Sequence, residues 1–182
     1  MEIEFRAFVK NLSKTEFLIK SLNAKFVEEV HIIDYWFCKN SAKSFDDVKQ
    51  DKPGSFGLRI RNVNNRFELT SKVLIKPGDH NAFDEFETEI DNLDNAMKIL
   101  KSIGFRVFCV IDKTRRTFRL DNVSINLENI KGFPPAVELE IIADNNISEH
   151  KLKLQSLIDK LDIKEKIDKS ITFLFMKENF KC

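Results

Sequence analysis

Polar and apolar residues alternate along much of the chain, which is typical of strands that bury only one face. The first nine residues show it best: Glu2, Glu4 and Arg6 share one side, while Ile3 and Phe5 share the other. The pattern, with β-branched and aromatic enrichment, predicts eight strands. They cover residues 1–9, 26–38, 56–62, 66–75, 83–90, 105–120, 123–130 and 136–142.

Four other stretches carry helical spacing or a capping residue at their start. They predict helices over 13–24, 91–103, 148–161 and 164–177. The strands and helices do not alternate one for one, and neighbouring strands are joined by hairpin-like spacings. This order favours an antiparallel α+β architecture over a doubly wound sheet. The length of 182 residues fits one domain, so we expect a single domain over 1–182.

Seven of the strands place charged side chains on a single face. These stripes are Glu2/Glu4/Arg6, Arg59/Arg61, Glu68/Thr70/Lys72, Glu85/Glu87/Glu89, Lys113/Arg115, Asn126/Glu128 and Glu138/Glu140. For any one stripe the simplest interpretation is a solvated sheet face. The stripes nevertheless segregate by sign and contain few neutral polar residues. A sheet curled into a barrel could turn them inward, where clustered cations would bind a polyphosphate and carboxylates would hold Mg²⁺ or Mn²⁺.

The composition argues against several classes of protein and of binding site. The chain has 30 Lys+Arg and 29 Asp+Glu, a formal net charge of +1, which excludes a generally basic nucleic-acid-binding protein. Three cysteines and three scattered histidines, without a CxxC pair, argue against a disulfide framework and a Cys/His zinc site. The sequence shows neither a signal peptide nor an apolar run of about 20 residues, so we expect a cytoplasmic protein without a membrane span.

The order of several motifs resembles the CYTH superfamily, the triphosphate tunnel metalloenzymes. The opening Glu2–Arg6 is similar to the family's ExExK motif, with Arg6 in place of lysine. Later segments resemble its LRxR, LTxK, ExE, KxR and ExE elements in sequence order, and they are LRIR (58–61), LTSK (69–72), EFETE (85–89), KTR (113–115) and ELE (138–140). Glu128 stands where the family pattern has Asp, and Trp36 where it has Tyr.

The resemblance implies an eight-stranded antiparallel β-barrel, the triphosphate tunnel, with helices packed outside. It implies phosphate binding by Arg59, Arg61, Lys72, Lys76, Lys113 and Arg115. It implies metal binding by Glu2, Glu4, Glu128, Glu138 and Glu140, a catalytic role for Glu2, Glu4 and Arg6, and a place inside the tunnel for Glu87 and Glu89. The implied cofactor is Mg²⁺ or Mn²⁺.

The resemblance leaves three activities open. The first expectation is a class IV adenylate cyclase-like enzyme that converts ATP to cyclic AMP and pyrophosphate. A triphosphatase that hydrolyses inorganic, thiamine or nucleoside triphosphate is the close alternative. The third is a non-catalytic sensor that binds a polyphosphate or nucleotide. The implied partner is therefore ATP, thiamine triphosphate or tripolyphosphate, and because related cyclases form dimers, a homodimer is a further expectation.

Overall fold

The computed structural model describes residues 2–76, 83–142, 147–164 and 166–180. Its strands are β1 (Glu2–Phe8), β2 (Lys25–Lys39), β3 (Phe56–Val63), β4 (Arg66–Leu74), β5 (Phe83–Ile90), β6 (Phe105–Leu120), β7 (Val123–Ile130) and β8 (Ala136–Ile142). They pair in the order β1-β8-β7-β6-β2-β3-β4-β5, and each pair with a described register is antiparallel. All eight predicted strands are confirmed, with ends that differ by at most one residue.

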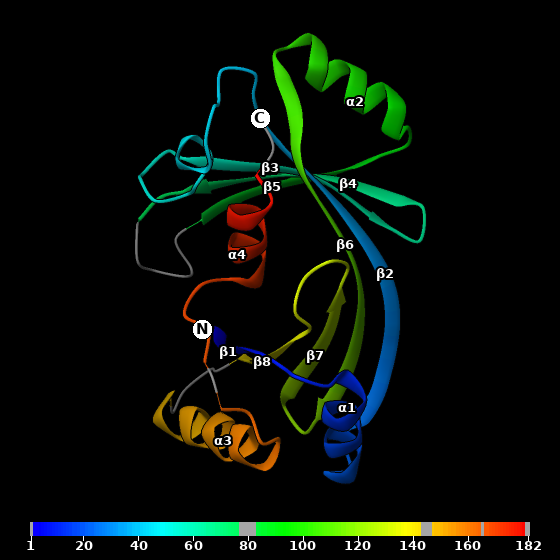
Figure 1. The fold of residues 1–182 in the computed structure, drawn as a ribbon, viewed down its shortest axis with the longest axis vertical. Coiled ribbons are helices and arrows are strands. Elements are labelled where there is room, and N and C mark those ends of the chain that lie inside the picture. Colours follow the sequence, from blue (N-terminus) through cyan, green and yellow to red (C-terminus); the bar gives the residue numbers. More distant parts are fainter. Residues whose placement is uncertain (1, 77–82, 143–146, 165, 181–182) are drawn as a thin grey trace. The chain divides into compact units, whose positions relative to one another are not determined.

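The helices are α1 (Leu12–Ser21), α2 (Leu93–Ser102), α3 (Ile147–Lys160) and α4 (Ile171–Glu178), with a short 3₁₀ turn at Phe45–Asp47 (Figure 1). Residues 1–31 and 113–171 form one compact unit, here called unit 1, and residues 32–112 and 172–182 form unit 2. Strands β2 and β6 each contribute residues to both units. The single domain over 1–182 stays a prediction.

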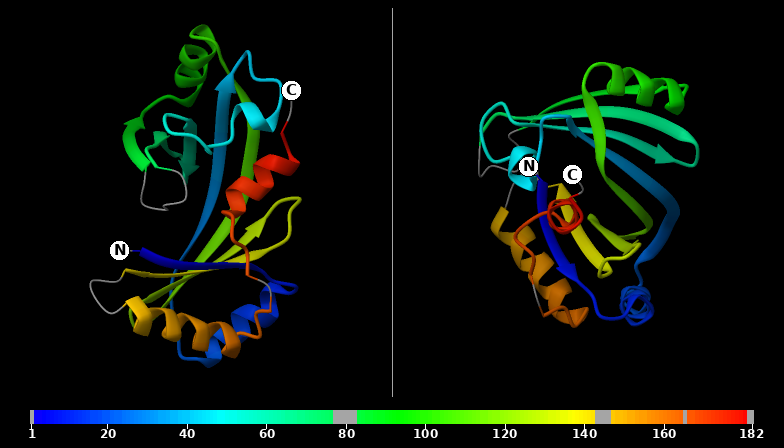
Figure 2. Two further views of the ribbon diagram at one scale, coloured as in Figure 1. Left: turned by 90° about the vertical axis from the view of Figure 1, so that its left-hand side faces the viewer. Right: turned by 45° about the horizontal axis from the view of Figure 1, so that its top comes forward.

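Unit 1 has its hydrophobic core on one face of β1, β8, β7 and the second half of β6. Phe5, Phe118 and Leu139 lie there, and Leu154 of α3 and Ile19 of α1 pack in the same cluster. Figure 2 shows α3 running along β1 in both views. The helices thus cover the apolar side of these strands, and the charged stripes lie on the opposite side because successive side chains alternate.

In unit 2, strands β3, β4 and β5 likewise have an apolar side and a charged side. Helix α2 lies over the apolar side, where its Leu100 packs in one cluster with Ile60 of β3 and Phe37 of β2. The hairpin between β3 and β4 turns at Asn64 and Asn65, whose φ angles of 52° and 64° are those of a tight two-residue turn. This turn fixes the register in which Arg59 lies opposite Thr70.

Helices α1 and α2 begin at residues that differ slightly from the sequence prediction. Helix α1 is capped by Asn11, whose side chain accepts from the backbone N–H of Lys14 at 2.9 Å, and α2 is capped in the same way by Asn92. The predicted caps, Ser13 and Asp91, lie within one or two residues of these positions. Either residue type can cap a helix, so sequence alone does not choose between neighbours.

The last helix begins at residue 171 instead of 164. Asp162 adopts a left-handed φ of 54° and ends α3, with the N–H of Ile163 donating to the carbonyl of Ile158. The chain then follows the free edge of β1, where Lys166 bridges Ala7 and the N–H of Ile167 donates to the carbonyl of Arg6 at 2.8 Å. Pairing with this edge satisfies backbone groups of β1 and therefore competes with helix formation.

Candidate functional site

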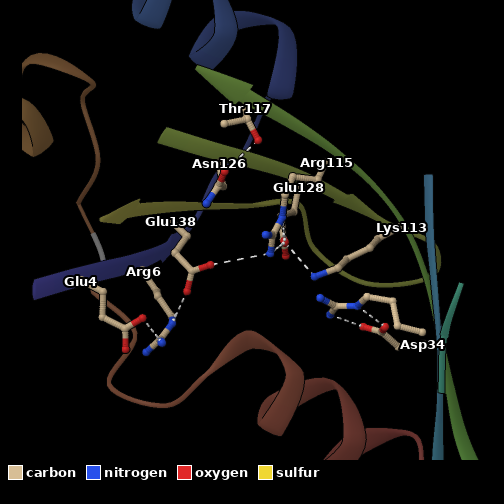
Figure 3. A network of polar contacts seen from close by, with 10 residues as sticks. Glu4, Arg6, Asp34, Lys113, Arg115, Thr117, Asn126, Glu128 and Glu138 are labelled. Carbon is tan, nitrogen blue, oxygen red and sulfur yellow. Dashed lines mark hydrogen bonds and ion pairs between the residues drawn. The ribbon is translucent and has the colours of Figure 1, made fainter. Parts of the chain in front are cut away.

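The polar face of unit 1 is organised as rows of side chains that cross neighbouring strands. One row joins Glu4, Glu140, Ser124 and Arg119, a second joins Arg6, Glu138, Asn126 and Thr117, and a third pairs Glu128 with Arg115. Strands lie about 4.8 Å apart in this direction, so neighbours in a row are within reach of one another. Figure 3 shows the second and third rows and contacts among their side chains.

Three carboxylates meet at one end of the first two rows. Glu4, Glu138 and Glu140 each offer an oxygen atom, and these atoms all lie within 4.8 Å of one another. All three side chains are partly buried, which raises the cost of keeping like charges together. Carboxylate oxygens are the ligands that Mg²⁺ and Mn²⁺ prefer, so this group fits a divalent cation.

Arg6 supplies positive charge to the same group. Its Nε donates to Glu138 Oε1 at 2.6 Å, and its guanidinium also forms an ion pair with Glu4 (Figure 3). Burial alone would lower the pKa of Arg6, but Glu138 and then Glu4 reverse this and hold the pKa above its usual value. The guanidinium therefore stays charged beside the carboxylates, where it can bind a phosphate oxygen.

Glu128 lies at the centre of a second, more deeply buried cluster. Its Oε1 accepts from Lys113 Nζ at 2.7 Å and from Nε and Nη2 of Arg115 at 2.8 and 2.6 Å. Its side chain is only 2% exposed and that of Lys113 6%, whereas that of Arg115 is 25% exposed. Burial raises the pKa of Glu128, but Lys113 and Arg115 more than offset that effect, so the pKa falls below its usual value.

The Glu128 cluster has a consequence for stability. Glu128→Gln should lower the free energy of unfolding by about 3 kcal/mol, because it leaves buried cations without a counter-charge. Chemical denaturation at neutral pH measures this. Glu29→Gln is the matched control: it breaks the pair with Arg116 at a site that is 46% exposed, and should cost under about 1 kcal/mol. Equal losses in the two variants would show that Glu128 is not a buried counter-charge.

The same carboxylate predicts a pH dependence. The pKa of Glu128 is lower in the folded protein than its ordinary value of 4.5, so its contribution is fully present above that value and is lost as the pH falls through the folded pKa. The stability difference between the wild type and Glu128→Gln should be constant from pH 7 down to about 4.5 and shrink below it. A difference that grows on acidification would contradict this assignment.

Unit 2 carries a polar face of its own. Arg59, Arg61 and Lys72 share it with Asp34 and Thr70, as the strand registers require. Asp34 is 1% exposed and accepts from Nε and Nη2 of Arg61 at 2.7 and 2.9 Å, a two-point ion pair. Lys72 Nζ lies 2.7 Å from Glu85 Oε1, at the more exposed end of the face.

Arg59 is the least compensated cation of this face. Its Nη2 donates to the Thr70 hydroxyl at 3.0 Å and lies 3.4 Å from Glu68, while its buried Nε has no hydrogen-bond partner among the described residues. Burial and then the neighbouring Arg61 lower the pKa of Arg59 below its usual value. A buried guanidinium with these properties is stabilised by an anion brought from solution.

Trp36 lies beside Arg59 and, like it, has a buried nitrogen without a hydrogen-bond partner among the described residues. The Arg59 guanidinium is 5.8 Å from the centre of the Trp36 ring, and the Trp36 indole N–H is also buried without a partner among the described residues. Gly57 makes room for the ring, because a Cβ there would lie 3.0 Å from the Trp36 side chain. Within the described residues, Arg59 and Trp36 thus offer two donors without partners on one face of unit 2.

The remaining predicted site residues are exposed, have no described side chain, or lie apart from the three-carboxylate group. Lys76 is exposed just after β4, and Glu87 and Glu89 are exposed on β5, a strand at one end of the sheet order. The backbone of Glu2 pairs with Ile142 in β1, but its side chain lies outside the described part of the structure. Glu128 is absent from the three-carboxylate group found among the described residues.

Sequence reasoning assigns no role to several residues of these faces. Asp34 lies on β2, and its contact with Arg61 follows from their direct pairing across β2 and β3. Thr117 donates to Asn126 at 3.0 Å in the row that ends at Glu138 and Arg6. Thr117 is neutral and carries no charge signal, so only the strand register identifies it.

Comparison with known proteins supports this picture. The model of the CYTH domain family matches residues 1–170. A curated protein of Methanocaldococcus jannaschii, named "Putative adenylate cyclase MJ0240", is 22% identical over 165 residues, which is 90% of each chain. None of the described helices has the length and apolar character that crossing a membrane requires.

Solved structures share the fold over nearly the whole chain. The PH1012 protein of Pyrococcus horikoshii OT3 is 26% identical, with a TM-score of 0.70 over 96% of this chain and 99% of that one. A Hippeastrum protein, named "Putative adenylyl cyclase HpAC1", is 18% identical, with a TM-score of 0.69 over 100% and 98%. These likenesses, with the family match, confirm the predicted eight-stranded triphosphate-tunnel fold.

Proposed function

Because the chain belongs to the CYTH domain family, we propose that it is a divalent-metal-dependent enzyme acting on a triphosphate-bearing substrate. Members of this family are adenylate cyclases or triphosphatases. The observation that carries the proposal is the meeting of Glu4, Glu138 and Glu140 beside Arg6 on one face of unit 1. Carboxylates can bind a metal cation and a guanidinium can bind a phosphate. A site that holds both ligands together is favoured because the cation and the phosphate offset each other's charge.

In this proposal, cations of unit 1 bind the phosphate oxygens of the substrate. Arg115 uses Nε and Nη2 on Glu128, and its Nη1 makes no hydrogen bond or ion pair within the described residues, so it remains available to a phosphate oxygen. Arg6 holds its charge beside Glu138. Both would neutralise charge on the phosphates as the transition state forms. A divalent cation held by Glu4, Glu138 and Glu140 would supply Lewis-acid stabilisation of the same oxygens.

Unit 2 has candidate anion ligands of its own, at positions that resemble the phosphate-binding motifs of the family. Arg59 and Trp36 present buried donors that have no partner among the residues the structure describes, and an anionic oxygen would satisfy both the hydrogen bonds and the charge. Arg61 is held in a fixed orientation by Asp34, which reduces the entropy lost when it binds a ligand. Lys72 and Lys76 are more exposed and would contribute less.

The reaction we propose first is cyclisation of ATP. The 3′-hydroxyl of the ribose attacks the α-phosphorus, the bond to the β-phosphate oxygen breaks, and the hydroxyl proton leaves to a base or water, giving cyclic AMP and pyrophosphate. The name of the Methanocaldococcus jannaschii relative, which matches 90% of this chain, supports this choice. Hydrolysis of a terminal phosphate is the second candidate, because the Hippeastrum protein is described as having a dominant triphosphatase activity.

Product analysis with Mn²⁺ separates the two candidates. With ATP labelled at the α-phosphate, we expect labelled cyclic AMP and an equal amount of pyrophosphate. Release of phosphate from γ-labelled ATP or from tripolyphosphate, without cyclic AMP, would replace cyclisation by hydrolysis. Tight binding of both compounds with neither product would instead indicate a sensor and contradict the enzyme proposal.

A further inference from the structure

A pocket on unit 1 adjoins the carboxylate group at the end of the first row. It has a volume of about 340 Å³ and is lined by Arg119, Asn122, Ser124, Glu140 and Ile142. The volume lies within the range of about 300–1,000 Å³ that is usual for small-molecule sites. Glu140 belongs to both the pocket and the three-carboxylate group, so the two share a wall.

The side chains of the pocket offer hydrogen-bond donors that other residues do not use. The Arg119 side chain is exposed and forms neither an ion pair nor a hydrogen bond among the described residues. The Asn122 carbonyl oxygen accepts from Lys153 Nζ at 2.6 Å, which fixes the amide and leaves its NH₂ group for a ligand. Ser124 adds a hydroxyl, and Ile142, 78% exposed, adds an apolar wall.

These features fit a nucleobase. A planar guanidinium stacks on aromatic rings, asparagine and serine bond to the edges of bases, and an exposed isoleucine covers part of a ring. A phosphate fits the pocket less well, because Glu140 opposes the single cation Arg119. A cationic ring such as the thiazolium of thiamine would meet Arg119 as a like charge.

We propose that this pocket binds the base of a nucleoside triphosphate whose phosphates lie along the polar face of unit 1. The inference rests on the proposed function and names its substrate class. On β6, Arg119 and Arg115 are four residues apart, about 13 Å at a strand's rise per residue. A base at Arg119 therefore places the α-phosphate nearest Glu4 and Glu140, and the later phosphates toward Arg6 and Arg115.

The test compares one ligand that has a base with one that lacks it. Calorimetric titrations with Mn²⁺ use a methylene-bridged ATP analogue and tripolyphosphate. The double variant Arg119→Ala, Asn122→Ala should weaken binding of the ATP analogue about 10-fold, since each residue contributes a hydrogen bond or a stacking contact. Binding of tripolyphosphate should not change. Arg66→Ala, an exposed arginine on β4 of unit 2, is the control and should alter neither affinity.

Two results would overturn the inference in different ways. Equal effects on the two ligands, or no effect on either, would show that the pocket does not contact the base while leaving the proposed function intact. A wild-type protein that binds neither ligand would contradict the proposed function, and this inference would fail with it. Thermal denaturation of the double variant should match that of the wild type, because both residues lie at the surface end of the pocket.

Discussion

Arg59→Met is expected to lower kcat/KM for the triphosphate substrate by a factor on the order of 10³, the usual scale for an arginine that binds a transferring phosphate. The reason is that Arg59 is buried, lies next to a second arginine, and has an Nε without a hydrogen-bond partner in the described part of the chain. It therefore contributes little to the fold and is suited to binding an anion. Methionine keeps the length and apolar character of the side-chain stem, and it removes only the charge and the donors.

The stability of Arg59→Met separates the functional role from a structural one. The lowered pKa of Arg59 means that the fold disfavours its charged form, so removing the charge should leave the melting temperature unchanged or raise it. Loss of activity with a retained melting temperature is the expected combination. Arg66→Met is the matched control, because that arginine is exposed and should affect neither property. Activity and stability that fall together would assign Arg59 to the fold alone.

Glu4→Gln should weaken Mn²⁺ binding by about 100-fold or more and lower turnover to match. Even residues that merely support metal ligands change affinity by about 10–100-fold, and Glu4 would be a direct ligand. Glutamine keeps the size of the side chain and one carbonyl oxygen, but it removes the charge that a divalent cation requires. Turnover measured against Mn²⁺ concentration shows whether the loss is one of metal affinity.

The matched control for Glu4→Gln is Glu28→Gln, which changes an exposed carboxylate of β2 in the same unit. It should leave the Mn²⁺ dependence unchanged. High Mn²⁺ concentrations should partly restore the activity of Glu4→Gln, since Glu138 and Glu140 remain in place. An unaltered Mn²⁺ dependence in Glu4→Gln would remove Glu4 from the metal site.

The strand faces could be predicted because alternation determines them. Glu138 and Glu140 must share a face with each other, and so must Arg59 and Arg61, wherever the strands lie. The partner of each stripe is set by register, which depends on turns and on pairing between distant segments. The contact between Asp34 and Arg61, and the pocket that Arg119 and Glu140 line together, therefore follow only from the structure.

Glu128 shows most clearly that motif spacing does not determine which contacts a side chain makes. Its place in the sequence resembles a metal-binding position, and that role stays a prediction. In the structure its carboxylate oxygen accepts from Lys113 and Arg115, in a cluster separate from the three grouped carboxylates. Opposite charges on neighbouring strands pair when burial makes an isolated charge costly. Pairing between distant segments also explains why residues 166–170 are not helical, since the open edge of β1 offers backbone partners to Lys166 and Ile167.

The central claim, a metal and a triphosphate bound on the polar face of unit 1, is tested most directly by crystallography. Crystals grown with Mn²⁺ and a methylene-bridged ATP analogue would be measured for anomalous scattering by manganese. We expect a manganese peak within coordinating distance of Glu4, Glu138 and Glu140, with phosphate oxygens beside Arg6 and Arg115. A manganese peak elsewhere, with the three carboxylates bound only to protein groups, would contradict the claim.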